Sequence, residues 1–488
     1  MTPLFPWALS IPTGIEGSIT LGFLLLGVVG IGNLLVYREY SHLVPAVIHV
    51  SGGILALLAR DLITLLVAWE ILAFSAFFLL PGSSTTFGRS VRLRYLSVQI
   101  VATVLFFLAT VVHVGASDSV AVAVLHRDAQ PFMLGALLLK AAVFPLHFWL
   151  VDAYPAASSR VTPLLSVFAT KVGVVSAARL LRFAPAAVPV VGLLGAISAV
   201  VAVVFALRQH HPRRLLSYHI VSQIGYMIAA IGLAHTTSGD LAVTAGLFHL
   251  LTHTFYKALL IMVAVAATDL AGGNEDLTTM GGLGFRRPLL LVCGIIGAAA
   301  ISGVPFTSGY ASKYLLKGVT EGVPVIAVLL EIASIGTGLS FIKFIYLIFF
   351  APRSPEPEPP LPPERHRATA AMAPIVIIAA ATVAMGALPH RLPGVPATRF
   401  FTGSAILASL RPLAVSAILW PFLKGRLTKP RQGKTIEPHR LWSLTTGALA
   451  SSGRAGPGRT IVRAHDQDPR VQLVIVLVGL IGVVWFLR

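Results

Sequence analysis

Five lysines lie inside long apolar segments of this 488-residue sequence, where a positive charge is costly. They are Lys140, Lys171, Lys257, Lys313 and Lys343. The arginines are placed differently, because nearly all 28 of them stand at the ends of apolar segments. Arginine keeps its proton in a protein, whereas a lysine in an apolar environment can also exist as the neutral amine. This sorting of the two residue types favours a role for the lysines in proton transfer.

Two carboxylates also lie deep in apolar segments. Glu70 follows Trp69 in LITLLVAWEILAFSAFFLL, and an unpaired carboxylate in such a segment would be protonated. We therefore expect a lysine partner for Glu70 and a role in a relay or gate, with an inert contact between helices as the alternative. For Glu331, the relay and the structural interpretation are equally open.

Two of the apolar segments are interrupted close to a lysine. In GALLLKAAVFPLHFWLVDAYPAA, Pro145 follows Lys140 by five residues, and proline breaks a helix that carries the preceding turn. In AISGVPFTSGYASKYLL, glycine and proline residues at 303–309 come just before Lys313. Breaks at membrane depth line protein or water cavities and are typical of ion sites. The recurrence suggests an internal duplication; the alternative is that the lysines extend to the membrane surface, most of all Lys313.

The flanks of the first break add two candidates. His147 and Asp152 either form the mouth of the broken helix or cap its ends.

A third group of candidates lies within uninterrupted segments. Lys171 stands in the middle of its segment, while His249, His253 and Lys257 are spaced i, i+4, i+8 and share one helical face over about 12 Å. This face favours a proton path, with buried hydrogen-bonded histidines as the alternative. Two histidines at this spacing can bind zinc, but no further ligand is near in sequence, so we predict no metal site. Lys343 is close to the end of its segment among aromatic residues, where it could equally extend to the membrane surface.

The composition shows which elements must hold these residues. Hydrophobic residues make up 56% of the chain, charged residues only 11%, and mean hydropathy is +0.84, whereas soluble proteins have about 25% charged residues. We expect an all-α polytopic membrane protein with about 14 spans, and continuous apolar runs exclude an outer-membrane barrel. The predicted spans are 17–37, 44–60, 62–81, 97–115, 131–150, 161–182, 188–207, 217–234, 242–267, 289–318, 323–350, 369–389, 403–422 and 471–487. The least regular is 403–422, because it contains Arg411 and Pro412.

Loop charges predict the orientation of these spans. Alternate loops carry thirteen basic residues on one side and, up to residue 400, seven on the other. Basic loops stay in the cytoplasm, so we expect the N-terminus outside, in a bacterial-type inner membrane. No Lys or Arg precedes 17–37, so this segment is expected to be retained rather than cleaved as a signal peptide. The net charge of +18 then reflects topology and contact with anionic lipid, and no nucleic-acid partner is needed.

Two segments are not expected to span. Residues 351–368 form a Pro/Glu-rich linker, and residues 423–470 form a basic tail with ten Lys and Arg, followed by a last span in 471–488. The tail either lies on anionic lipid or contacts a neighbouring subunit. Cys293 is the single cysteine, and there is no phosphate-binding loop, so we expect no cofactor in this chain.

The chain resembles the antiporter-like subunits shared by respiratory complex I, membrane-bound hydrogenases and multisubunit Mrp-type cation/proton antiporters. The resemblance runs from about residue 30 to residue 350. It rests on these motifs: AWE at 68–70, LLLKAAVFPLHFWLVDAYPAA at 137–157, TKVGVVSAARLL at 170–181, RRLLSYHIVSQIGYM at 213–227, FHLLTHTFYKALL at 248–260 and SGVPFTSGYASKYLL at 302–316. Lysine at position 171 is more similar to the Mrp D-type subunit than to the largest complex I member. Because Glu70 comes early, the resemblance implies a start about two helices later than in the family, and 423–487 has no clear match to the short end of the D-type subunit.

The resemblance implies roles for the candidates and a division of the chain. Glu70 and Lys140 would form a charge pair, Lys171 would be the central lysine, His253 or Lys257 the bridge, and Lys313 the terminal residue. The chain would comprise an N-terminal span (1–43), two inverted five-helix repeats (44–182 and 188–350), the linker, C-terminal spans (369–422), the tail and the last span.

Three functions remain open from the sequence. The first is a proton-translocating subunit of a multisubunit Na⁺ or K⁺/proton antiporter. The second is a pumping subunit of a complex I-like NADH:quinone oxidoreductase or hydrogenase, and the third is a membrane subunit of an inorganic-carbon uptake complex or an idle scaffold. All three imply other hydrophobic subunits as partners, and the proteins that co-purify with the chain would distinguish them.

Overall fold

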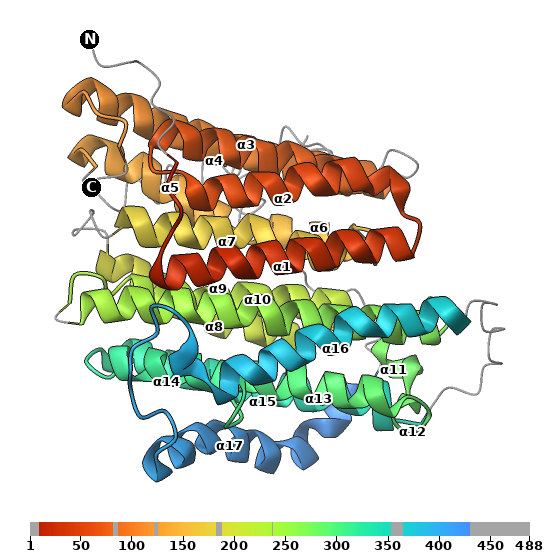
Figure 1. Ribbon diagram of the computed structural model, residues 1–488. Coiled ribbons are helices and arrows are strands. Elements are labelled where there is room, and N and C mark those ends of the chain that lie inside the picture. The colour runs from red at the N-terminus through yellow and green to blue at the C-terminus, as the bar shows by residue number, and fades with distance from the viewer. Residues whose placement is uncertain are drawn as a thin grey trace, which may run out of the picture.

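The computed structural model describes residues 9–81, 86–121, 125–181, 188–236, 238–352 and 365–429. Within these ranges the chain is a bundle of helices that run side by side along one common direction (Figure 1). Most of the predicted linker, the basic tail beyond residue 429 and the predicted last span lie outside the described residues.

The helices of the N-terminal half correspond to the first six predicted spans. They are α1 (Gly14–Val36), α2 (Leu43–Leu58), α3 (Leu62–Leu79), α4 (Thr86–Ser117), α5 (Gln130–Lys140), α6 (Phe148–Ala156) and α7 (Thr162–Leu180). Short 3₁₀ turns precede α2 and α5. The span predicted at 131–150 is thus divided between α5 and α6, as the proline in it indicated.

The C-terminal half corresponds to the next seven predicted spans. Its helices are α8 (Val188–Leu207), α9 (Pro212–Ile231), α10 (Gly239–Leu270), α11 (Leu277–Met280), α12 (Leu283–Arg286), α13 (Pro288–Ser302), α14 (Ser308–Thr320), α15 (Pro324–Ile345), α16 (Arg365–Ala387) and α17 (Gly403–Thr428). A π-helical turn extends α15 over Tyr346–Phe350. The least regular predicted span is the continuous helix α17, which runs through Arg411 and Pro412.

The prediction of an all-α polytopic membrane protein is confirmed. Nine helices in the described part of the chain are long and apolar enough to cross a membrane. The broken helices α5/α6 and α13/α14 make two further crossings from shorter pieces. Helix α9 carries Ser, His and Gln side chains along its length, but it is buried inside the bundle rather than facing lipid.

The chain contains two successive groups of five crossings, and the fourth crossing of each is the broken one. The first group is α2, α3, α4, α5/α6 and α7, and the second is α8, α9, α10, α13/α14 and α15. Both breaks contain a non-glycine residue with a left-handed backbone, Ala142 (φ 57°) and Phe306 (φ 66°). Such strained residues persist only where the surrounding structure holds them, and they cluster at functional sites.

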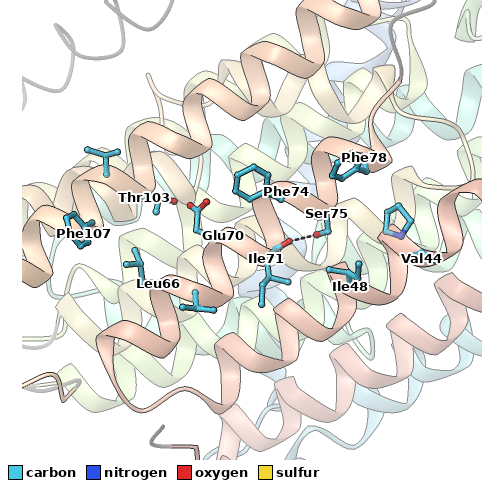
Figure 2. Close-up of a pocket in the computed structure, with 13 residues that line it drawn as sticks. Val44, Ile48, Leu66, Glu70, Ile71, Phe74, Ser75, Phe78, Thr103 and Phe107 are labelled. Atoms are coloured by element: carbon cyan, nitrogen blue, oxygen red, sulfur yellow. Dashed lines mark hydrogen bonds between the residues drawn. The ribbon is translucent and has the colours of Figure 1, made fainter. Parts of the chain in front are cut away.

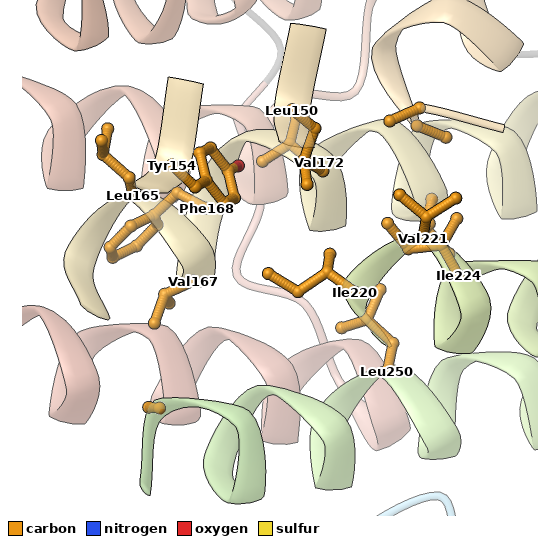
Figure 3. Packing of buried hydrophobic residues seen from close by; sticks show 14 of the residues in the cluster. Leu150, Tyr154, Leu165, Val167, Phe168, Val172, Ile220, Val221, Ile224 and Leu250 are labelled. Carbon is orange, nitrogen blue, oxygen red and sulfur yellow. The ribbon is translucent and has the colours of Figure 1, made fainter. Parts of the chain in front are cut away.

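Helices α7 and α10 form the centre of the bundle. Every residue of α7 from Thr162 to Leu180 is buried, as is nearly all of α10. Figure 3 shows side chains of α6, α7, α9 and α10 packed together, among them Phe168 and Ile220. Because lipid does not reach these two helices, their polar side chains face other protein groups.

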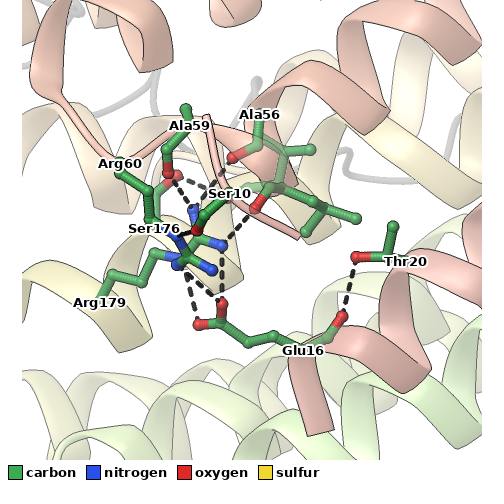
Figure 4. Close-up of polar contacts among 10 residues, drawn as sticks. Ser10, Glu16, Thr20, Ala56, Ala59, Arg60, Ser176 and Arg179 are labelled. Atoms are coloured by element: carbon green, nitrogen blue, oxygen red, sulfur yellow. Dashed lines mark hydrogen bonds and ion pairs between the residues drawn. The ribbon is translucent and has the colours of Figure 1, made fainter. Parts of the chain in front are cut away.

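A buried ion pair joins one end of α1 to α2 and α7. Arg179 donates two hydrogen bonds to the carboxylate of Glu16, at 2.7 and 3.1 Å (Figure 4). It also donates to the carbonyls of Ala56, Leu57 and Ala59, where α2 ends. The guanidinium therefore satisfies carbonyls that the end of a helix leaves without a partner.

Candidate functional site

Lys140 is the last residue of α5, and its side chain is completely buried. Its Nζ donates to Gln99 Oε1 on α4 at 2.9 Å and to the carbonyl of Trp69 on α3 at 3.3 Å. Helix α7 packs directly against this point, because a Cβ on Gly173 would lie 2.8 Å from the Ala141 nitrogen. The break after Lys140 thus places the amine between three helices, with neutral oxygens as its acceptors.

Glu70 has no direct contact with a lysine among the described residues, although Lys140, its expected partner, is an electrostatic neighbour. Glu70 lines a groove of about 780 Å³ between α2, α3 and α4, together with Phe74, Phe78 and Thr103 (Figure 2). Its Oε1 is buried and has no hydrogen-bond partner among the described residues, and none of their ion pairs within 4 Å includes it. Successive residues of a helix point about 100° apart. Glu70 therefore faces this groove, while the neighbouring Trp69 points inward. The carboxylate acts on Lys140 only over a longer distance.

Lys171 lies in the middle of α7 and is fully buried. Its Nζ donates to the carbonyl of Ser166 one turn earlier, at 2.5 Å. Its electrostatic neighbours are across the interface on α10, His253 and Lys257. Helices α7 and α10 therefore bring together candidates from the two groups of five crossings.

The three candidates on α10 are all completely buried. His249 is held by Ser312 Oγ on α14 (2.9 Å, through Nδ1) and by Gln223 Oε1 on α9 (3.1 Å, through Nε2). The rings of His249 and His253 have centroids 6.5 Å apart. Lys257 Nζ donates to the Leu216 carbonyl at 3.3 Å.

His253 differs from the other two candidates on α10. Neither of its ring nitrogens has a hydrogen-bond partner in the described part of the chain. Its electrostatic neighbours are Lys171, Lys257, His249 and His219. A ring with two unused nitrogens among several bases can accept a proton from either side.

Lys313 lies on α14, five residues after that helix begins, and is 7% exposed. Its Nζ points back to the carbonyl of Ile301 near the end of α13, at 2.8 Å, and lies 5.2 Å from the centre of the Tyr226 ring. The alternative that Lys313 extends to the membrane surface is therefore wrong. A cavity of about 500 Å³, lined by Lys313, Ser302, Ser334 and residues of α17, adjoins the amine.

Two weaker candidates make structural contacts. Lys343 is completely buried and donates to the carbonyls of Leu207 (2.8 Å) and Gln209 (2.6 Å), so it caps the end of α8 and does not extend to the membrane surface. Glu331 lies 3.2 Å from Lys317 Nζ and 3.3 Å from Arg411 Nε, and these contacts link α15 to α14 and α17.

The two candidates that flank the first break, Asp152 and His147, have different surroundings. Asp152 pairs with Arg94 and with Arg214, which favours the capping interpretation. His147 is buried, and neither ring nitrogen has a hydrogen-bond partner among the described residues. It packs against the rings of Phe144 and Tyr218.

Several buried polar residues at the site were missed from the sequence. Gln99 and Gln223 accept from Lys140 and His249, and His219 Nε2 lies 2.7 Å from Ser340 Oγ. His49 on α2 is completely buried, with Nδ1 2.9 Å from Ser75 Oγ, and Lys140 is its electrostatic neighbour. The available signal was a histidine or glutamine inside an apolar segment, as in VPAVIHVSGG and LSYHIVSQIGYM.

Amines, imidazoles and hydroxyl groups thus follow one another through the interior. Lys171, Lys257 and His249 are electrostatic neighbours of His253, and His249 is bonded to Ser312, which precedes Lys313 in the chain. These groups bind protons and carry no redox function.

Known proteins share this architecture. Residues 59–340 match the family described as "NADH:quinone oxidoreductase/Mrp antiporter, TM". The chain is 28% identical to the D subunit of the Na⁺/H⁺ antiporter of Alkalihalophilus pseudofirmus over 300 residues, which are 57% of this chain and 59% of that protein. It is 38% identical to the L subunit of NADH-quinone oxidoreductase of Pseudomonas aeruginosa over 187 residues, which are 37% of this chain and 29% of that protein. The chain thus spans less than two thirds of the length of both relatives.

Among solved structures, one chain of the Mrp complex from Dietzia sp. DQ12-45-1b superposes with a TM-score of 0.65 at 25% identity. This likeness covers 97% of the present chain and 88% of the other. Since the family match extends over more than half of the chain, this multi-pass membrane protein belongs to the NADH:quinone oxidoreductase/Mrp antiporter transmembrane family.

Proposed function

We propose that this chain is the proton-translocating subunit of a multisubunit Na⁺ or K⁺/proton antiporter. The observation that carries the proposal is the bonding of its buried lysines. Lys140, Lys171, Lys257 and Lys313 each donate to a neutral carbonyl or amide oxygen. A lysine held by a carboxylate would leave an unpaired anion on losing its proton, whereas a neutral acceptor leaves none.

Side chains between the lysines supply the intermediate steps. His253 is an electrostatic neighbour of both Lys171 and Lys257, and Ser312 bonds both His249 and Thr252 next to Lys313. Atoms with no partner among the described residues, such as His253 Nε2 and Gln223 Nε2, can each bind a water molecule, which would carry the proton over the longer gaps.

Glu70 is the proposed gate. Two unit charges several Å apart in a protein interact by about 2–4 kcal/mol. This is comparable to the ~2.3 kcal/mol needed to move one charge through 100 mV. Protonating or ionising Glu70 therefore changes the free energy of protonating Lys140 by an amount sufficient to control one transport step.

The proposed setting is a larger hetero-oligomer in a bacterial inner membrane, with the N-terminus outside and the basic tail on anionic lipid. The Mrp complex of Dietzia supports the partners, because it contains a chain of the same fold. The cation remains unassigned between Na⁺ and K⁺, and the similarity to the D subunit of an antiporter supports only the class of activity.

A second candidate is the pumping subunit of a complex I-like oxidoreductase. The similarity to the L subunit of NADH-quinone oxidoreductase favours it, at 38% identity over its shorter range. Mild extraction of the native complex separates the two. Co-purifying flavin and iron–sulfur subunits would support the oxidoreductase, and only small hydrophobic subunits would support the antiporter.

Replacing the lysine at the first break tests the relay itself. Lys140→Ala should abolish cation-driven proton movement in inverted vesicles while the complex still assembles. The matched control is Lys429→Ala, which removes an exposed lysine beyond the end of α17 and should leave transport intact. Full transport in a well-assembled Lys140→Ala complex would refute the proposal.

A further inference from the structure

A second pocket lies at the other end of the bundle from the Lys313 cavity. Its lining comes from the end of α1, the start of α7, the end of α10 and the starts of α13 and α16. The volume is about 320 Å³. We call it the Arg287 pocket, and none of the proton-relay candidates lines it.

The rim of the Arg287 pocket is positively charged. Arg160, Arg286 and Arg287 line it against one carboxylate, Asp269. Arg160 is occupied by Asp269 at 2.7 Å and lies 3.4 Å above the Tyr37 ring. Arg287 is exposed, and no described residue bonds its guanidinium. The rim therefore carries one guanidinium, that of Arg287, which no described residue neutralises.

Two kinds of hydrogen-bond donor supplement this charge. Asn33 lines the pocket, is 6% exposed, and its side-chain amide has no partner among the described residues. The pocket also includes Leu289 and Leu290, in the first turn of α13, where N–H groups have no partner within the helix. Donors at a helix N-terminus attract anions.

The remaining wall is apolar. Met262, Val265, Leu289, Met372 and Ile375 line the pocket. The charged residues of the pocket lie at the helix ends, and the apolar wall extends along α10 and α16 toward the middle of the bundle. A free anion would match only the rim, and an apolar molecule only the wall.

We propose that the Arg287 pocket binds an anionic phospholipid. Arg287 and the start of α13 hold the phosphate, Asn33 donates to the glycerol or ester oxygens, and the acyl chains lie along Met262 and Met372. The bound lipid links α1 and α16 to α10 and α13. None of the residues that line this site belongs to the predicted basic tail, and the proposal does not depend on the proposed transport function.

The experiment uses the purified complex after removal of lipid in mild detergent. The thermal unfolding midpoint is measured with added phosphatidylglycerol, phosphatidylcholine or inorganic phosphate at equal phosphorus, and native mass spectrometry counts bound lipids. Phosphatidylglycerol should raise the midpoint and be retained, whereas the other two should not. An equal shift with inorganic phosphate or phosphatidylcholine would contradict the proposal, because the wall or the charge would then be irrelevant.

Three variants locate the effect. Arg287→Gln should weaken the response to phosphatidylglycerol about tenfold, as expected for one charge-assisted contact. Ala266→Phe fills the pocket without altering charge and should abolish the response. Arg208→Gln, an exposed arginine beyond the end of α8 that does not line the pocket, should leave it unchanged. An unaltered lipid count and an unaltered response in both pocket variants would overturn the proposal and favour contact of this surface with a neighbouring subunit instead.

Discussion

Lys140 and Gln99 form a hydrogen bond of 2.9 Å between an amine and a neutral amide oxygen, in the interior of the first group of five crossings. The acceptor comes from α4, a helix on which no candidate was predicted. Within the proposed relay, this oxygen holds Lys140 in place without determining whether it is charged.

Gln99→Glu should slow transport. A carboxylate at this distance makes the bond charge-assisted, worth roughly 1–2 kcal/mol more than the neutral one, and so retains the proton on Lys140. The proton flux in vesicles should fall about tenfold, with normal amounts of assembled complex. Gln130→Glu at the start of α5, whose amide bonds only the Leu125 carbonyl, is the matched control. Equal fluxes in the two variants would contradict the role of the neutral acceptor.

The two histidines of α10 should respond differently to removal. His253 has no hydrogen-bond partner among the described residues, so His253→Leu should change stability little while abolishing transport. His249→Leu removes one hydrogen-bond partner each from the buried Gln223 and Ser312, and the loss of these two bonds should cost roughly 1–3 kcal/mol. Thermal unfolding and proton flux measured on both variants check this. A His253→Leu complex with wild-type flux would remove His253 from the relay.

Lys343 should matter for stability rather than for transport. Lys343→Met leaves the buried carbonyls of Leu207 and Gln209 without their donor, which should lower stability by about 1–3 kcal/mol. The flux per assembled complex should remain near wild type. Loss of flux at an unchanged unfolding midpoint would instead place Lys343 among the proton carriers.

The two broken helices could be predicted from the sequence because the signal is local. Proline cannot donate to the preceding turn, so Pro145 and the glycine and proline residues at 303–309 mark the breaks without knowledge of any neighbour. The burial of Lys171 and Lys257 followed equally from the length of the apolar segments around them.

Partners from other helices could not be predicted in this way. Whether Glu70 meets Lys140 depends on how α3 is rotated relative to α5, and a one-residue difference changes the direction by about 100°. Lys343 is close to the end of its segment in sequence, but the end of α8 covers it in the bundle. His49 and Gln99 gain significance only from their closeness to Lys140, which tertiary packing alone creates.

Acid should destabilise the contact between the start of α9 and the loop after α10. Burial would raise the pKa of Glu275, but its hydrogen bond to His211 and the charge of Arg213 outweigh burial and lower the pKa. A lowered pKa means that the stabilisation is complete above the ordinary glutamate range near 4.3 and is lost as pH falls through the folded value. In Glu275→Gln, the unfolding midpoint should therefore fall less steeply on acidification than in wild type. Parallel pH profiles would contradict this assignment.

The orientation can be tested through the single cysteine. Cys293 is the single cysteine of the sequence, so a Cys293→Ala variant of this chain carries no thiol. Ser404 is exposed at the start of α17, and Arg208 is exposed beyond the end of α8, at the opposite end of the bundle. If the N-terminus is outside, as the loop arginines predict, a membrane-impermeant maleimide should label Ser404→Cys in intact cells. It should label Arg208→Cys only in inverted vesicles, and the reverse pattern would invert the topology and with it the direction of the proposed proton path.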